Sequence, residues 1–208
     1  MKARMASIAA AALLAGCGGF SHEVRPTVWL ALEPTPPGGG LRVGGPTIEV
    51  GRFAAAPPFD TDRVATREGG GRWAFAVYHR WAATPGEMVA ARLREALGGL
   101  DLFGAVFTPP APLDADYRLS GAVRGLWWDR EARSAVIEIE VALVAPPDRL
   151  RSFRVRSAAV PVDGDTVEGF LEAASTALAQ VLAEVGRDVA GALAEPAARG
   201  DSGATITR

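Results

Sequence analysis

Residues 117–145 read YRLSGAVRGLWWDREARSAVIEIEVALVA, and this stretch decides the fold. It contains two long segments rich in β-branched and aromatic residues, 117–128 and 135–145, with a polar loop between them. A pair of prolines ends the second segment, and another strand candidate follows at 152–162. Consecutive strands joined by short loops pair antiparallel, so we expect a three-stranded meander.

The middle segment of this meander alternates strictly between apolar and polar residues. Its apolar side chains share one face: Ile137, Ile139, Val141 and Leu143. On the other face we expect glutamates to pair with arginines that parity places nearby: Glu138, Glu140, Arg124, Arg154 and Arg156. Such cross-strand pairs contribute about 0.2–1 kcal/mol each, so these charges need no chemical role.

Shorter strand candidates precede the meander at residues 28–32, 47–54 and 72–81. The last of them leads into Thr84-Pro85-Gly86-Glu87, a capping box that predicts the start of a helix. The apolar residues of this helix form one stripe, and a glycine pair weakens its end: Val89, Leu93, Leu97, Leu100, Gly98 and Gly99. The stripe is typical of a helix that lies on a sheet.

A second helix follows the meander. Asp165 or Thr166 can cap its start, and its apolar periodicity continues to about Ala194. Beyond it, residues 196–208 are small and polar, so we expect a disordered tail.

The amino terminus has the features of an export signal. Lys2 and Arg4 precede an apolar run at residues 5–15. A membrane-spanning helix needs about 20 apolar residues, whereas the apolar part of a signal peptide needs about 7–15. We therefore expect residues 1–16 to be a signal peptide.

Leu14-Ala15-Gly16-Cys17 resembles the bacterial lipobox, in which the cysteine receives lipid before the signal is cut. The alternative is an ordinary residue beside a conventional cleavage site. Cys17 is the only cysteine, however, and an unpaired thiol is a liability in an oxidising compartment unless modification consumes it. We expect a lipidated tether at residues 17–26. Gly18 differs from the aspartate that favours inner-membrane retention in enterobacterial lipoproteins, so the outer membrane is favoured over the inner.

Composition limits the partners. Without residues 1–16 the chain keeps 192 residues, enough for one domain, which we place at 27–195. The net charge of −2 becomes −4 without Lys2 and Arg4, and the arginines are scattered. This pattern favours neither nucleic acid nor a polybasic membrane contact.

Candidates for catalysis are few. The two histidines, His22 and His79, lie apart in the sequence, and lipidation would consume the thiol. The loop aspartates lack the spacing of metal ligands or of an acid–base pair: Asp60, Asp62, Asp114 and Asp116. The glycine runs at 38–40 and 69–71 lack the lysine and hydroxyl of a phosphate loop and read as hairpin or surface loops. We therefore expect no enzyme, no metal and no cofactor.

Trp127 and Trp128 are adjacent in a predicted strand, and this pair is the most informative candidate for an interface. Adjacent strand residues point to opposite faces, so one tryptophan packs inward. The other must be exposed, covered by another element, or held in an interface. We favour an interface.

Three further stretches carry a family resemblance. Asp62-Arg63-Val64-Ala65-Thr66-Arg67 places two arginines around short residues before a strand, and Tyr78-His79-Arg80-Trp81-Ala82 closes a strand just before a helix. In the final helix, Ser175, Ala177 and Leu178 precede Arg187-Asp188-Val189-Ala190. With the lipobox, these resemble the ABC-type transport auxiliary lipoproteins, the family of the PqiC component of lipid-trafficking systems that contain MCE proteins. The family commonly has an acidic residue before the proline, where this chain has Thr84.

The resemblance implies an α/β domain of the α+β type. It would be a two-layer sandwich with a mixed or mainly antiparallel sheet and two helices on one face, and the element order agrees. It also implies a non-enzymatic accessory of a lipid transport system, with an MCE-domain protein and an inner-membrane ABC permease and ATPase as partners. Arg80 and Trp81 join Trp127 and Trp128 as candidate interface residues. A homo-oligomer, and a structural envelope lipoprotein or assembly factor without a transport role, stay open.

Overall fold

The computed structural model describes residues 26–35, 37–110, 114–147 and 149–195. The expected signal peptide, the lipobox with Cys17, all but Pro26 of the tether, His22 and the tail at 196–208 lie outside these residues. The helices and strands are, in chain order, β1 (Val28–Leu30), β2 (Thr47–Ala55), β3 (Arg63–Glu68), the short 3-10 turn η1 (Gly69–Gly71), β4 (Arg72–Trp81), α2 (Pro85–Gly98), β5 (Ala105–Phe107), β6 (Tyr117–Asp129), β7 (Ser134–Ala145), β8 (Arg149–Pro161) and α3 (Val167–Ala194).

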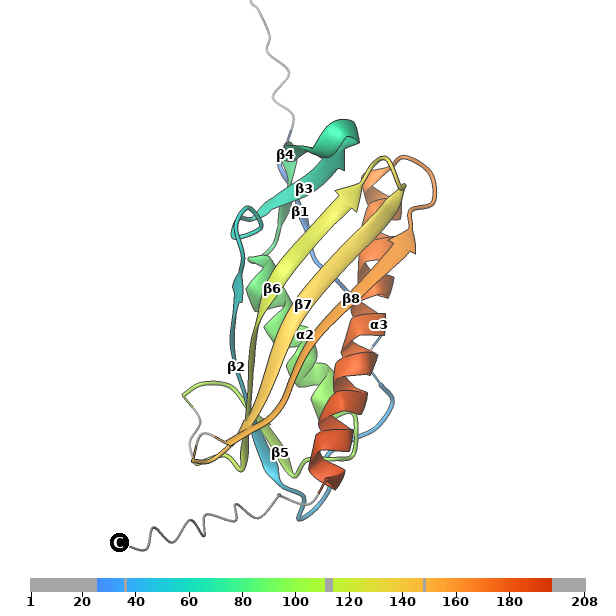
Figure 1. Cartoon of the computed structure of the whole chain (residues 1–208). Helices are drawn as coiled ribbons and strands as arrows, with labels where there is room; N and C mark the ends of the chain where they lie inside the picture. The colour runs from blue at the N-terminus through green and yellow to red at the C-terminus, as the bar shows by residue number, and fades with distance from the viewer. Residues whose placement is uncertain (1–25, 36, 111–113, 148, 196–208) are drawn as a thin grey trace, which may run out of the picture.

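The predicted meander forms one side of the sheet, with β8 at the edge (Figure 1). β6 pairs antiparallel with β7, and β7 with β8, over almost their full lengths. Ile137, Ile139 and Leu143 are buried on one face, as the alternation predicts. The long strands therefore follow from the local pattern.

On its other side, β6 is flanked by two strands in succession, and both run parallel to it. β2 lies beside its first half and β3 beside its last residues. β5 extends the sheet beyond β2, while β4 pairs antiparallel with β3 and β1 runs parallel to β4. The sequence patterns did not predict β3, β5 or these parallel pairings. β3 reads RVATRE, without alternation, and β5 has only three residues.

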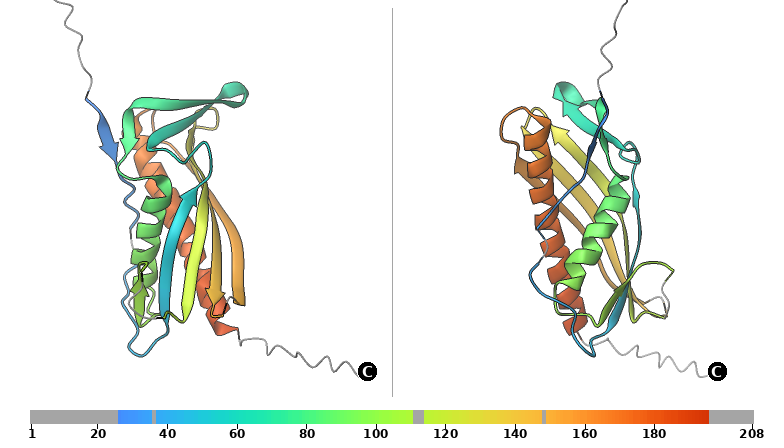
Figure 2. Two further views of the ribbon diagram at one scale, coloured as in Figure 1. Left: turned by 90° about the vertical axis from the view of Figure 1, so that its left-hand side faces the viewer. Right: turned by 180° about the vertical axis from the view of Figure 1, so that it is seen from behind.

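Both helices cover the same face of the sheet (Figure 2). α2 packs on β2 and α3 on β7 and β8. The capping box at the start of α2 is confirmed, because the Glu87 carboxylate accepts from the Thr84 amide at 3.0 Å. α3 begins with Thr166 rather than Asp165 as its cap, since the Thr166 hydroxyl accepts from the Gly169 amide at 3.1 Å. Its 28 residues span about 42 Å at about 1.5 Å per residue.

One predicted charge arrangement is partly wrong. Arg124 donates to Glu140 at 2.8 Å, as expected. Arg154 and Arg156, however, lie opposite Val141 and Ile139 in the β7–β8 ladder, so they share the helix-facing side. Parity within one strand does not reveal the register of its neighbour.

Arg156 reaches α3 from this side. Its guanidinium donates to the Asp188 carboxylate at 2.6 and 2.8 Å. The hydrogen bond to Asp188 raises the pKa of Arg156 above its ordinary value. This pair ties the edge strand to the helix.

The predicted architecture is confirmed: one mixed sheet of eight strands with two helices on one face. The helices run along the long axis in the same direction. The β3–β4 hairpin and β1 lie across one end, where the described chain begins, and the carboxyl end of α3 lies at the other (Figures 1 and 2).

Candidate functional site

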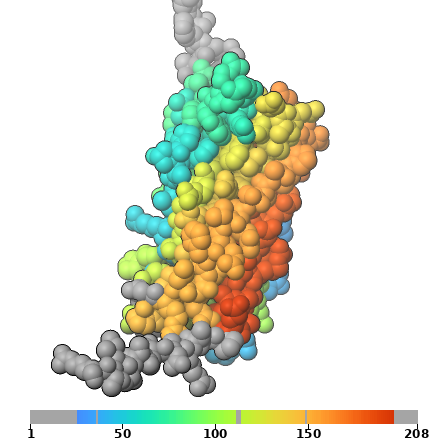
Figure 3. Space-filling model, viewed as in Figure 1, coloured from blue at the N-terminus to red at the C-terminus, as the bar shows by residue number. Residues whose placement is uncertain are grey.

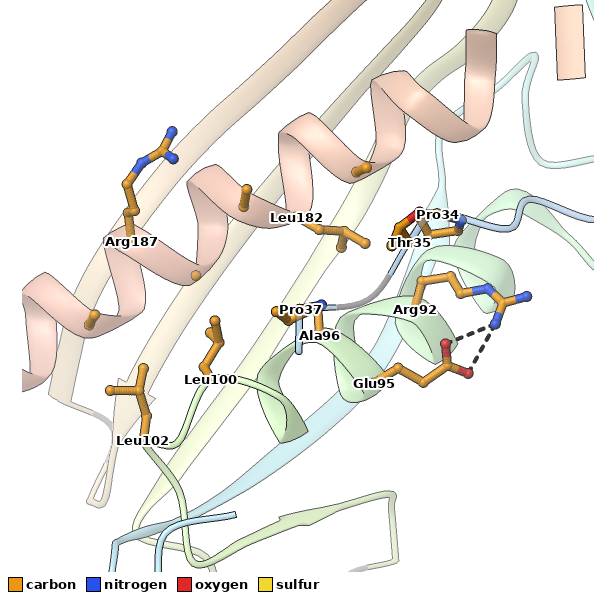
Figure 4. A pocket seen from close by; sticks show the side chains of 14 residues that line it. Pro34, Thr35, Pro37, Arg92, Glu95, Ala96, Leu100, Leu102, Leu182 and Arg187 are labelled. Atoms are coloured by element: carbon orange, nitrogen blue, oxygen red, sulfur yellow. Dashed lines mark hydrogen bonds and ion pairs between the residues drawn. The ribbon is translucent and has the colours of Figure 1, made fainter. Parts of the chain in front are cut away.

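An apolar groove lies between α2 and α3, beside the segment that follows β1 (Figure 4). Its volume is about 380 Å³, within the range of small-molecule sites. Most of its lining is aliphatic or small: Pro34, Thr35, Pro37, Arg92, Glu95, Ala96, Leu100, Leu102, Ala179, Leu182, Ala183, Gly186, Arg187 and Ala190. We call it the interhelical groove.

Small residues on α3 create this space. Ala179, Ala183, Gly186 and Ala190 follow one another at helical spacing and give that helix a shallow side. Leu100 lies over Gly186, where an added Cβ would come within 2.9 Å of its Cδ1. A methyl group at this position would therefore require the Leu100 side chain to shift.

Two of the charged residues around the groove, Arg92 and Glu95, pair with each other. Arg92 donates to Glu95 at 2.8 and 3.1 Å and to the Leu32 carbonyl at 2.9 Å. Arg187 extends away from Leu100 and Pro37 (Figure 4). The groove offers an apolar surface suited to binding an apolar group, and the Glu95 carboxylate in its lining is engaged by Arg92.

The aspartates singled out in the sequence lie in two different segments, one before β3 and one before β6. Asp62 accepts from Arg80, and Asp116 accepts from the Thr47 amide and hydroxyl, both at 2.8 Å. The bond from the Thr47 amide, then that from its hydroxyl, holds the pKa of Asp116 below its ordinary value. Asp60 and Asp114 are exposed. Within the described ranges, no three His, Cys, Asp or Glu side chains form a group that could hold a metal ion.

Glycine run 69–71 forms the turn η1 between β3 and β4, as predicted for a hairpin loop. His79 is half-buried in β4, opposite Val28 of β1.

Trp127 and Trp128 point to opposite faces, as predicted. Trp128 is buried on the helix side, where its ring stacks on Phe170 with centroids 5.3 Å apart. The Arg130 guanidinium lies 3.9 Å from the Trp128 ring centroid. Trp128 is therefore a core residue.

Trp127 lies on the opposite face, where other elements cover it only in part. Its ring contacts Phe59 and Trp73, with centroids 5.8 and 5.7 Å away, and we call these three residues the aromatic corner. Gly125 makes room, because a Cβ there would come within 2.3 Å of the Trp127 ring. The Trp127 indole N–H is buried with no hydrogen-bond partner among the described residues, which costs about 1–3 kcal/mol.

Arg80 and Trp81 have different surroundings. Trp81 is only 1% exposed and packs against Phe170. Arg80 donates to both carboxylate oxygens of Asp62 at 2.9 Å and stays partly exposed. Of the four candidate interface residues, Arg80 and Trp127 reach the surface, whereas Trp81 and Trp128 lie in the core.

A family model described as "ABC-type transport auxiliary lipoprotein component" matches residues 31–186. This span includes both layers of the sandwich and the whole aromatic corner. The chain belongs to this family. Its members are lipoproteins associated with ABC-type transport, which indicates a membrane-anchored location in the cell envelope. In the part of this auxiliary lipoprotein that the structure describes, no helix is long and apolar enough to cross a membrane.

Solved structures share the fold of this auxiliary lipoprotein. Protein XCC0632 from Xanthomonas campestris, of the DUF330 family, is 23% identical with a TM-score of 0.62, covering 80% of this chain and 94% of its own. An uncharacterized protein is 17% identical with a TM-score of 0.64, covering 79% of this chain and 99% of its own. No curated protein matches the sequence.

Sequence reasoning missed the interhelical groove and the partners of both tryptophans, Phe59 and Phe170. The small residues of α3 were a readable signal for a close or hollow helix contact. The aromatic contacts had no such signal, because they join residues far apart in the chain.

Proposed function

We propose that this auxiliary lipoprotein is a non-enzymatic accessory of an ABC-type lipid transport system that includes an MCE-domain protein. Lipidated at Cys17, it would be held in the outer membrane and face the periplasm. There it would meet the MCE protein and, through it, the inner-membrane permease and ATPase.

The family match over residues 31–186 carries this proposal. The lipobox-like sequence before Cys17 supports the anchor, and Gly18 supports the outer membrane. The apolar interhelical groove is compatible with a lipid-handling system, and the carboxylates of Asp62 and Asp116 make structural contacts.

Deletion of the gene tests the proposal. We expect loss of membrane-lipid asymmetry and greater detergent sensitivity, both restored by the parent chain. In the restored strain, a photo-crosslinking residue in place of Arg187, which is exposed beside the interhelical groove, should capture an MCE-domain protein. The matched control carries the same residue in place of Val43, which is fully exposed.

A normal barrier together with an absence of MCE crosslinks would contradict the proposal. A weakened barrier with crosslinks only to structural envelope proteins would instead identify a structural lipoprotein.

A further inference from the structure

An exposed apolar patch lies at the end of the molecule where the described chain begins. It consists of two residues of β1 and two of β4: Val28, Trp29, Val77 and Tyr78. Their exposed fractions range from 42% to 61%. β1 pairs with β4 so that Val28 lies opposite His79 and Trp29 opposite Arg80, which places all four residues at the same end of the sheet. We call this the terminal patch.

The exposure of Val77 and Tyr78 is built into the strand. In the β3–β4 ladder, Arg63 lies opposite Arg80, whereas Ala65 lies opposite Phe75, so residues 76–79 bulge out of the pairing. Bulges redirect side chains and are structural features rather than defects.

Arg63 holds this bulge in place. Its Nε donates to the Ala76 carbonyl at 3.1 Å, and its Nη2 contacts the Phe75 carbonyl at 3.4 Å. Arg80, which follows the bulge, forms an ion pair with Asp62. Two nearby cations are thus engaged within the domain while apolar side chains face outward.

The length of chain before β1 indicates what meets this patch. Residues 18–25 separate Cys17 from Pro26, and even fully extended they reach at most about 30 Å at about 3.3–3.6 Å per residue. α3 alone is about 42 Å long. Trp29 borders the first turns of α3, together with Glu168 and Leu171. A lipid on Cys17 therefore keeps this end within about 30 Å of the membrane, whereas the far end can lie farther away.

We propose that the terminal patch rests in the headgroup region of the membrane that holds Cys17 and fixes how the domain stands on it, an inference that rests on the lipid attachment within the proposed function. Tryptophan and tyrosine favour this region because one part of each ring is apolar and another forms hydrogen bonds. The hairpin lies across this end in Figure 2 and presents its outer strand there; Figure 3 shows the same end in space-filling form. Multiple acyl chains already secure attachment, so the patch sets orientation rather than affinity.

The test uses the acylated full-length protein in vesicles of phosphatidylethanolamine and phosphatidylglycerol. A Val77→Cys variant carries the only free thiol, because Cys17 is acylated, and takes an environment-sensitive fluorophore. The matched control is Leu150→Cys, 59% exposed at the start of β8. Arg151 beside it donates to the Ala192 carbonyl at the carboxyl end of α3, which places Leu150 at the far end.

We expect nitroxide-labelled lipid to quench the probe at position 77 at least threefold more than the probe at position 150. Trp29→Ser in the Val77→Cys background should reduce that quenching. Equal quenching at both positions would overturn the proposal.

A second arm inserts about 20 Gly and Ser residues after Gly19. If the probe at position 77 is still quenched with the longer tether, the patch itself contacts the membrane. If the quenching disappears, the short tether alone held this end near the membrane, and the proposal is overturned. A probe that leaves water only when an MCE-domain protein is added would identify a protein-docking surface instead, which also overturns the proposal.

Failure of lipidation is distinguishable, because the protein then does not float with the vesicles. Failure of the transport role would leave the quenching unchanged.

Discussion

At the scale of single residues, Asp116 illustrates how a loop carboxylate can be structural. It joins the start of β2 to the start of β6 by accepting two hydrogen bonds from Thr47, whose own hydroxyl accepts from the Asp116 amide at 3.0 Å. The exchange fixes the parallel register of these strands. From the sequence this aspartate could only be read as a loop acid.

The lowered pKa of Asp116 predicts a pH dependence of stability. Because the folded pKa lies below the ordinary value of 3.8, the unfolded chain binds the proton first. The stabilisation is fully present above that value and is lost as pH falls from there through the folded pKa. Denaturant titrations between pH 5 and pH 3 should therefore show a shallower decline in the free energy of unfolding for Asp116→Asn than for the parent. Thr47→Ser keeps both donors and should retain the parent's slope; identical slopes in all three proteins would refute the prediction.

At the scale of elements, α3 combines a core face with a shallow side. Its large apolar residues pack on β7 and β8, while its alanines and glycines leave the interhelical groove. Gly186 and Gly191 lie in the same helix but have different neighbours. An added Cβ at Gly191 meets nothing within 4 Å, whereas one at Gly186 meets Leu100.

Alanine at these two positions separates the effect of helix propensity on stability from the effect of the contact with Leu100. Gly191→Ala should raise the free energy of unfolding by about 0.5–1 kcal/mol, because alanine loses less backbone entropy in a helix. Gly186→Ala should gain less, since Leu100 must shift to admit the methyl group. Chemical denaturation of both variants measures the difference. An equal gain at both positions would show that Leu100 does not close over Gly186.

At the scale of the whole molecule, the two ends of the domain differ. The chain begins beside the terminal patch and the β3–β4 hairpin, the groove lies between the helices, and the carboxyl end of α3 lies at the opposite end (Figure 1). An anchor before β1 would leave the groove and the far end accessible to periplasmic partners. The geometry therefore suits a protein that connects a membrane to another assembly.

The proposed anchor at Cys17 predicts how the whole protein distributes between cell fractions. Cys17→Ser should abolish incorporation of radiolabelled palmitate and release the protein into the soluble periplasmic fraction. Gly18→Asp should keep the lipid but shift the protein towards the inner membrane in an enterobacterial host. Fractionation on a sucrose gradient distinguishes the three proteins. Palmitate incorporation by the serine variant would exclude Cys17 as the attachment site.

The sequence by itself determined most of the elements. Alternation predicted the buried face of β7, and capping residues at Thr84 and at Asp165 or Thr166 predicted where the helices begin, because these signals act between residues close in the chain. Only the tertiary structure decided the parallel pairing of β2 and β3 with β6, the helix-facing side of Arg156, and the cover over Trp127. Each of these depends on the register between distant segments. That register is set by packing the whole core, so no local pattern contains it.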